Sequence, residues 1–399
     1  MYGAFGWGNT YEFAKGDGPV TIYGGTGNGS FNNLQMAAGI AASDVIFQTD
    51  AAGDLLIKLR STGETITAPN DLSSQWWGTA SLMGQVAFAD GTTINLNRNS
   101  NQLLTFTWTG AAGNTTMTGN GLGNNLFELG PNDVATGAVN VSNTYSFAKG
   151  DGPVTIYAPG GLYTVNTLQM AAGITASDVI FQSDAAGDLL IKLLSTGDTV
   201  TALNDLSFHN WGVASLLGQI NFADGTSIAL NRNWGQNLTF TWPGTAGATL
   251  NGSPWGNTLF EIGAGGTANG VAGLGSTYQL GANFGQVRIN NNGSATSQVD
   301  FDPSVSDNQL WFARNGNDLD VDVLGTNEQR IVAGWYNNAN AQVQSFQTAD
   351  GLKLDSGVAQ LVAAMATYSA ANPGFNPATA TQMPTDSGVQ GAIAAAWHH

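Results

Sequence analysis

Residues 10–23 read TYEFAKGDGPVTIY, and residues 144–157 read TYSFAKGDGPVTIY. The two stretches differ only where Glu12 in the first corresponds to Ser146 in the second. Each contains two short runs rich in aromatic and β-branched residues, separated by Gly-Asp-Gly, which is typical of a strand, a turn and a second strand. A chain that contains such a unit twice is built from tandem copies of a β-rich module.

The repeat extends well beyond this stretch. The two stretches lie 134 positions apart. At the same spacing, SDVIFQ recurs at residues 43–48 and 177–182, and AAGDLLIKL recurs at residues 51–59 and 185–193. A third, diverged copy begins at Tyr278, where GQVRI replaces the GPVTI of the second copy. We therefore expect β repeat units at residues 1–133, 134–267 and 268–354, followed by a helical C-terminal segment at residues 355–399.

Within a unit, apolar residues recur with a period of two, which indicates strands with one buried face. DLLIKLRSTGETITA, residues 54–68, predicts two strands joined at residues 61–64. VAFADGTTINL, residues 86–96, predicts a hairpin that turns at Asp90 and Gly91, because an Asp-Gly pair tolerates positive φ. The fold class predicted from these patterns is all-β, with tandem β-roll or β-sandwich-like units.

Only the C-terminal segment has a helical pattern. Val358, Leu361, Val362 and Met365 recur at three- and four-residue spacing, with Asp355 or Ser356 as the expected N-cap. A second short helix is expected over residues 387–397, with a capping box from Ser387 to Gln390.

The composition excludes several function classes. The 399 residues carry 28 acids and 11 bases, a formal net charge of −17. No basic surface is available to displace counterions, so nucleic acid and anionic membrane are not expected as partners. No apolar run is long enough for a transmembrane helix, and the N-terminal residues contain no recognisable signal peptide. Cysteine is absent, which fits an extracellular bacterial protein and is also compatible with the cytosol.

These motifs resemble a known family. The run Tyr-x-Phe-x-x-Gly-Asp-Gly at Tyr11, followed by Asp-Leu-x-Ile and Phe-Ala-Asp-Gly-Thr, is similar to the haemolysin-type calcium-binding related repeat of RTX proteins. Residues 310–365 resemble the C-terminal end of many large RTX proteins. The resemblance implies an extracellular or cell-surface protein exported by type I secretion, with the export information C-terminal, in residues 355–397.

The resemblance also implies calcium as a cofactor. The candidate metal ligands are the acids of the repeated Gly-Asp-Gly and Ala-Asp-Gly turns, namely Asp17, Asp151, Asp90 and Asp224. The alternative is that these aspartates hold tight turns. Asparagine stands where an acid would be expected in the related coils, at Asn9, Asn124 and Asn257, which weakens the calcium prediction.

Catalytic candidates are few. A Ser-His-Asp triad would require His209, because the other two histidines end the chain, and the first repeat has Gln75 at the matching position. The repeated acids flank Gly or Ser in turn-like stretches, which suits turns better than paired catalytic carboxylates. No catalytic residue is predicted, and we expect the protein not to be an enzyme.

Tryptophans provide a further candidate surface. Four of them lie in polar, loop-like surroundings where their rings could stack on sugars or contact another subunit: Trp76, Trp77, Trp211 and Trp234. Trp108 and Trp242 occupy matching strand positions and are expected in the core.

Two function classes remain open. The first is a secreted structural protein that self-assembles into a filament, surface layer or biofilm matrix, because tandem β units with few charges leave sheet edges weakly protected against pairing. The expected partner is then another copy of the chain, in a homo-oligomer or polymer. The second is a calcium-dependent adhesin or a module that binds cell-surface or matrix polysaccharide.

Overall fold

The computed structural model contains two compact units. The first comprises residues 1–179 and 188–233, and the second comprises residues 180–187 and 234–399. The residues that the structure describes are 1–4, 8–23, 32–50, 52–69, 71–72, 83–96, 104–110, 114–159, 165–206, 217–230, 238–281, 283–292 and 296–399.

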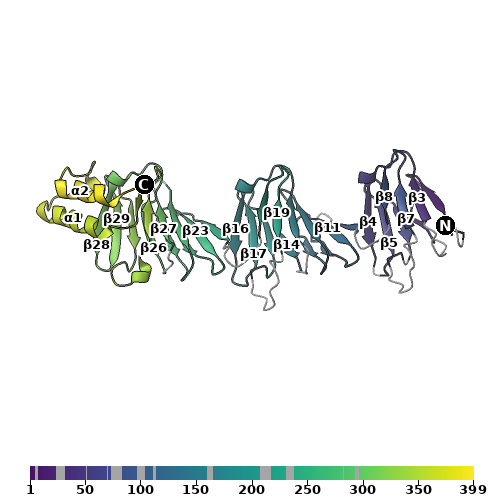
Figure 1. Ribbon diagram of the computed structural model, residues 1–399, viewed down its shortest axis with the longest axis horizontal. Coiled ribbons are helices and arrows are strands. Elements are labelled where there is room, and N and C mark those ends of the chain that lie inside the picture. Colours follow the sequence, from purple (N-terminus) through teal and green to yellow (C-terminus); the bar gives the residue numbers. More distant parts are fainter. Residues whose placement is uncertain are drawn as a thin grey trace. The chain divides into compact units, whose positions relative to one another are not determined.

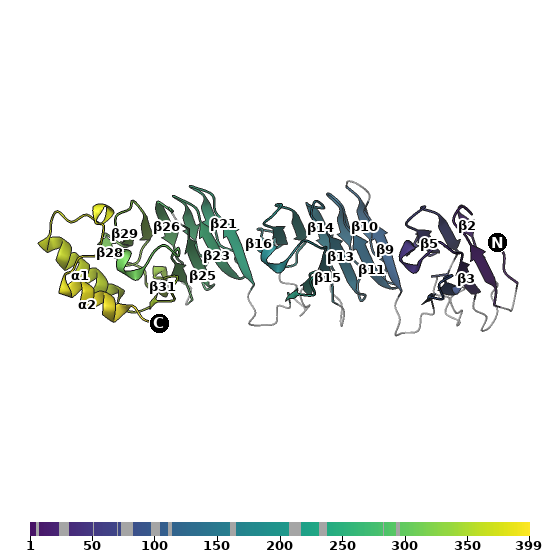
Figure 2. The ribbon, with the colours of Figure 1, turned by 90° about the horizontal axis from the view of Figure 1, so that it is seen from above.

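Six sheets pair into three sandwiches (Figures 1 and 2). In the first sandwich, one sheet has the order β1 (Thr10–Phe13), β3 (Asn32–Met36), β7 (Met83–Ala87), β8 (Thr93–Asn95). The facing sheet has the order β2 (Val20–Thr21), β6 (Thr65–Ala68), β5 (Leu55–Leu59), β4 (Val45–Thr49). Buried side chains of both sheets, such as Phe13 and Ile57, form one core.

The second sandwich has two six-stranded sheets. One has the order β9 (Thr105–Thr109), β11 (Asn124–Glu128), β13 (Asn143–Phe147), β15 (Thr167–Met170), β19 (Gln219–Asn221), β20 (Ser227–Ala229). The other has the order β10 (Thr116–Thr118), β12 (Val134–Thr136), β14 (Val154–Tyr157), β18 (Thr199–Ala202), β17 (Leu189–Leu193), β16 (Val179–Ser183).

The third sandwich repeats this plan. One sheet has the order β21 (Thr239–Pro243), β23 (Asn257–Ile262), β25 (Ser276–Leu280), β27 (Gln298–Asp300), β31 (Ser345–Gln347), β32 (Lys353–Leu354). The other has the order β22 (Thr249–Asn251), β24 (Thr267–Asn269), β26 (Gln286–Asn290), β30 (Gln329–Val332), β29 (Asp318–Val323), β28 (Leu310–Asn315). Short 3₁₀ turns are η1 (Ala42–Asp44), η2 (Ala176–Asp178), η3 (Asp307–Gln309), η4 (Ala339–Ala341) and η5 (Pro377–Thr379).

The strands form parallel coils followed by antiparallel hairpins. From β9 to β15 the chain alternates between the two sheets, and each strand pairs in parallel with the strand one coil later. Hairpins then follow, as predicted: β5 pairs with β6, and β7 pairs with β8 across Asp90 and Gly91. The all-β, tandem-repeat prediction is confirmed, and each sandwich is a β-roll ending in hairpins.

The sheets and the sequence repeats are out of phase. Strands β9 and β11 fall in the first repeat unit, residues 1–133, but β11 pairs with β13 of the second unit. A strand belongs to the sheet whose strands it is hydrogen-bonded to, whichever sequence repeat it comes from. The sandwich that contains β13 therefore begins at Thr105, upstream of residue 134.

Asparagines form a ladder inside the second sandwich. The Asn125 side-chain amide donates to Asn143 Oδ1 at 3.0 Å, eighteen residues on, and the Asn143 amide donates to Asn166 Oδ1 at 2.8 Å. Asn125, Asn143 and Asn166 are buried. Since a buried amide without partners would cost about 1–3 kcal/mol, this bonding fixes the register of successive coils. The sequence reasoning missed the ladder, although the asparagine at the start of each coil was its signal.

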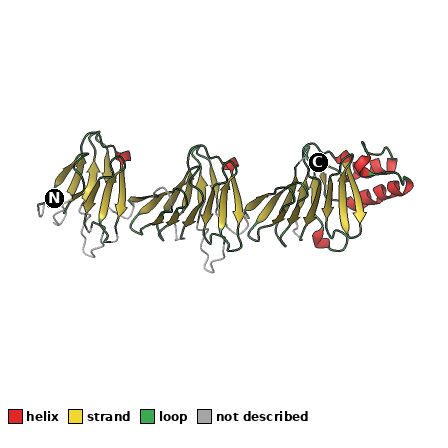
Figure 3. Ribbon diagram, turned by 180° about the vertical axis from the view of Figure 1, so that it is seen from behind, coloured by secondary structure: helices red, strands yellow, loops and turns green. Residues whose placement is uncertain are grey.

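The C-terminal helices are α1 (Val358–Ala371) and α2 (Ser387–Ala396), both packed into the core of the third sandwich (Figure 3). The predicted caps were wrong. Gly357, with φ of 86°, precedes α1 in place of Asp355 or Ser356, because a left-handed residue turns the chain out of β32. Asp386 caps α2 in place of Ser387, and its carboxylate accepts from two backbone N–H groups. In the part of the chain that the structure describes, neither helix is long and apolar enough to cross a membrane.

Candidate functional site

The Gly-Asp-Gly acids are engaged in their own turns. Asp17 Oδ2 accepts a hydrogen bond from the backbone N–H of Ala14 at 2.8 Å, and Asp151 Oδ2 accepts one from Ala148 at 2.6 Å. Burial raises the pKa of Asp151, and the nearby carboxylate of Asp198 raises it further. These contacts fit the turn-forming alternative, in which the carboxylate closes a backbone turn.

A second acid closes the same turn from another strand. Glu64 Oε1 accepts hydrogen bonds from the N–H groups of Gly16 and Gly18, each at 2.9 Å. Asp198 Oδ2 accepts from Gly150 at 2.8 Å in the second repeat. The turn of each of the first two repeats is thus closed by the carboxylate that precedes β6 or β18.

The Ala-Asp-Gly acids hold the tips of hairpins. Asp90 Oδ1 accepts from both the hydroxyl and the backbone N–H of Thr92, at 2.7 and 2.9 Å, and Asp224 makes the same two bonds with Thr226. The threonine hydroxyl bonds lower the pKa of both carboxyls. Over the described ranges, no group of three or more His, Asp or Glu side chains is arranged to hold a metal ion. The structure therefore does not bring the predicted calcium ligands together into one cluster.

The coil asparagines occupy the places where acids were expected, and they bond to the protein. Asn9 donates to Asn32 Oδ1 at 2.9 Å, Asn124 accepts from the backbone N–H of Ser142, and Asn257 accepts from that of Gly275 at 3.0 Å. Bonds of this kind link neighbouring coils without an ion.

The predicted tryptophan surface lies outside the described residues, since Trp76, Trp77, Trp211 and Trp234 all fall in the gaps, as does His209. Trp108 and Trp242, which were expected in the core, are described and are partly buried at its margin. Trp108 packs against the core of the first sandwich and donates through Nε1 to Asn125 Oδ1 at 3.0 Å. Trp242 packs against the core of the third.

The edge strand β4 of the first sandwich contacts β9, the first strand of the second sandwich. Gln48 at the edge strand β4 donates through Nε2 to the carbonyl oxygen of Thr107 in β9 at 3.0 Å. Phe106 of β9 is fully buried and belongs to the core of the first sandwich. We refer to Gln48, Phe106 and Thr107 as the β4–β9 contact. In it, an edge strand from outside the sandwich closes the end of its core.

The same hydrogen bond recurs in the second sequence repeat. Gln182, equivalent to Gln48, donates to the carbonyl oxygen of Thr241 at 3.2 Å. Phe240, the neighbour of Thr241, is fully buried. A side-chain amide to carbonyl bond next to a buried phenylalanine is therefore a repeated way of covering an edge strand.

In the third sandwich a helix covers the corresponding edge. Strand β28 has Ala313 in place of the glutamine, and α1 packs on it with the Met365 sulfur accepting from the N–H of Phe312 at 3.1 Å. Trp311 packs against Phe375 with ring centroids 4.5 Å apart and ring planes tilted by 48°. The helix thus takes the role that β9 has on β4.

One strand edge has no cover within the described residues. Strand β1 pairs with β3 alone, whereas its counterpart β13 pairs with both β11 and β15. In the facing sheet, just beyond the end of β2, Tyr2 bridges Tyr23, and their rings stack at 4.7 Å and are 84% and 43% exposed. A strand edge without a partner, such as that of β1, is suited to pairing with another strand.

A scan of known family models finds no match to this chain.

Proposed function

We propose that this chain is a secreted, non-enzymatic structural protein that self-assembles outside the cell into a filament, surface layer or biofilm matrix. The observation that carries the proposal is the β4–β9 contact, in which an edge strand and one buried phenylalanine close a neighbouring core. Its recurrence at Gln182 and Thr241 supports edge contacts as a general mode of association for these modules.

The β1 edge is the surface assigned to association between copies. Within the described residues its outer side has no strand partner, and β8 forms the opposite edge of the same sheet. Two different edges on one sheet permit a heterologous contact, which grows into an open assembly when its rotation does not close. Salt screens the repulsion expected from a net charge of −17 over distances beyond about 8 Å at physiological ionic strength.

Export by type I secretion is part of the same proposal, with the information in residues 355–399. This segment has no counterpart in the first two repeats. Calcium would contribute by neutralising turn acids such as Asp17 and Asp224 where copies meet.

The test compares two equivalent threonines. Thr10→Lys places a charge on the β1 edge, and the matched control Thr144→Lys places it on β13, which is paired on both sides. Sedimentation velocity and electron microscopy follow the purified proteins as salt and calcium are raised. We expect the wild type and Thr144→Lys to assemble and Thr10→Lys to stay monomeric. A wild type that remains monomeric throughout would disprove the proposal, and equal assembly of both variants would exclude the β1 edge.

A further inference from the structure

The third repeat changes the turn that the first two repeats close with a carboxylate. Parallel pairing of Val20 with Ile66, Val154 with Val200 and Val287 with Arg330 fixes the equivalent positions. By this register, Glu328 corresponds to Glu64 and Asp198, and Phe284 takes the place of Asp17 and Asp151. Asn283 replaces Gly16 and Gly150 and keeps a positive φ of 58°, which asparagine tolerates.

These replacements leave the Glu328 carboxylate without a turn to close. Its backbone N–H donates to the Thr326 hydroxyl at 3.0 Å, but no hydrogen bond holds its carboxylate among the described residues. A carboxylate can accept hydrogen bonds at both oxygens. Glu328 therefore retains an acceptor capacity that Glu64 spends on two backbone N–H groups.

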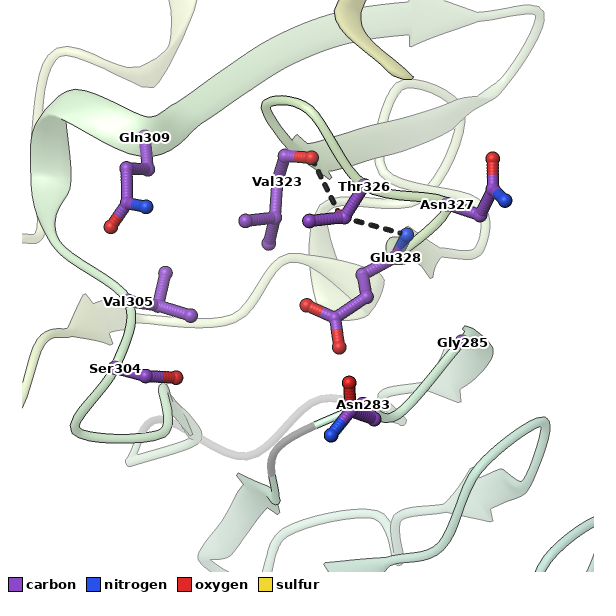
Figure 4. A pocket seen from close by; sticks show the side chains of 9 residues that line it. All are labelled: Asn283, Gly285, Ser304, Val305, Gln309, Val323, Thr326, Asn327 and Glu328. Carbon is purple, nitrogen blue, oxygen red and sulfur yellow. Dashed lines mark hydrogen bonds between the residues drawn. The ribbon is translucent and has the colours of Figure 1, made fainter. Parts of the chain in front are cut away.

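The freed carboxylate lines a pocket of about 440 Å³ (Figure 4). Five of its nine lining residues have polar, uncharged side chains, Glu328 carries the one charge, and the two apolar side chains are Val305 and Val323. The lining residues are Asn283, Gly285, Ser304, Val305, Gln309, Val323, Thr326, Asn327 and Glu328. The side-chain amide of Asn283 has no bonded partner in the described structure and points toward Glu328, so a donor and acceptors both face this space.

A buried cation lies next to the pocket wall. Arg330 is fully buried, and its guanidinium carbon lies 4.1 Å from the ring centre of Phe284 and 4.0 Å from that of Phe301. Phe284 stands between Asn283 and Gly285, both of which line the pocket. None of the three guanidinium nitrogens has a hydrogen-bond partner within the described residues.

This arginine is not explained by stability. The equivalent positions hold the buried apolar side chains Ile66 and Val200, and an unpaired buried charge is strongly unfavourable. Arg330 does place a positive charge near Glu328.

We propose that this pocket binds one ring of a neutral sugar, as part of a polysaccharide. The Glu328 carboxylate accepts hydrogen bonds from two adjacent hydroxyls, and the amide of Asn283 bonds to another oxygen of the sugar. Val305 and Val323 contact the apolar C–H face of the ring. A neutral sugar fits better than an acidic one, because the carboxylate would repel a second negative charge. Sugar binding at this pocket is a second function, and it does not require that the chain self-assembles.

The experiment titrates the full chain with the methyl glycosides of glucose, galactose and mannose, and with glucuronate, by ligand-observed NMR. We expect at least one neutral glycoside to bind with a Kd on the order of 1 mM, and Glu328→Ala to weaken it by about tenfold or more. Glu64→Ala is the matched control and should leave the affinity unchanged. Asn283→Gly restores the residue of the first two repeats and provides a second weakening variant if Glu328→Ala fails to fold.

Three results would overturn the proposal: no neutral glycoside binds, glucuronate binds more tightly than all of them, or binding is unaffected by both pocket variants. Calcium chloride is titrated in parallel, and calcium binding that requires Glu328, without sugar binding, would assign the pocket to a cation instead. Sedimentation of the same samples measures self-assembly independently, so that a failure of sugar binding is distinguished from a failure of self-assembly.

Discussion

The first and third sandwiches cover equivalent edge strands in different ways. On β4, the cover is strand β9, with Phe106 in the core and a glutamine-to-carbonyl bond at the rim. On β28, the cover is helix α1, with Leu361 and Met365 in the core. The comparison shows that the edge requires a cover that buries apolar side chains, and that a strand or a helix can meet this requirement. Only the strand cover resembles what another β module could supply.

The largest effect is expected from removing the helical cover. Leu361 is fully buried, so Leu361→Asp places a charge in the core of the third sandwich. We expect the free energy of unfolding of this region to fall by at least about 3 kcal/mol, and β28 to become exposed to association. Hydrogen exchange and sedimentation measure the two effects. Ala366→Asp, on the exposed face of the same helix, is the control, and equal behaviour of the two variants would show that α1 does not seal β28.

A smaller change, an increase in the free energy of unfolding, is expected from replacing Arg330 in the third sandwich. Arg330→Val restores the residue that the second repeat has at this position, and it removes an unpaired buried charge. We expect unfolding to become less favourable by about 1–4 kcal/mol, measured by denaturant titration. The reciprocal change, Val200→Arg, should destabilise the second sandwich. A loss of stability in Arg330→Val would mean that the guanidinium has partners in solution.

The smallest effect concerns the pH dependence of the turn acids. Because burial raises the pKa of Asp151, its ionisation opposes folding above its usual pKa of about 3.9, and this penalty is absent at lower pH. Asp151→Asn should therefore raise stability at neutral pH, by less than about 1 kcal/mol given solvent screening, and have no effect near pH 3.

Asp224 provides the opposite case. Its pKa is lowered by the Thr226 hydroxyl, so its contribution is present at neutral pH and lost as the pH falls through the folded pKa. Asp224→Asn should lower the melting temperature at neutral pH only. Thermal melts across this pH range check both variants, and matching pH profiles would contradict the assignment.

Much of the fold was predictable from local pattern. The alternation of DLLIKL and the Asp-Gly pair at residues 90–91 specify strands and a hairpin through side-chain period and turn chemistry alone. The helix pattern from Val358 was also sufficient to place α1. The caps were missed because cap choice depends on how the chain leaves β32, which is a tertiary constraint.

The candidate sites were less predictable. The β4–β9 contact joins residues 59 positions apart, and its only sequence sign is that Gln48 and Gln182 recur. The pocket of the third repeat depends on the adjacent replacements Asn283 and Phe284 and on Arg330, which lies far from them in sequence and meets them only through the register of β26 and β30. The sequence sign of this pocket is Arg330. It occupies a buried position of β30, where the alternation of buried and exposed residues along the strand predicts an apolar side chain.

The asparagine ladder also determines where such a chain can change length. Its rungs repeat after eighteen residues from Asn125 to Asn143 and after twenty-three from Asn143 to Asn166, yet both pairs bond and both strands stay in register. By the strand register, three of the five additional residues precede Ile156, the partner of Ala135, and two follow it, so both connections of the coil are longer. Insertions between strands therefore leave the stack intact, and removal of one whole coil would bring an equivalent amide next to the one that remains. We therefore expect a gene encoding this architecture to tolerate a change of length by whole coils, because the asparagine bonding and the strand register would be kept.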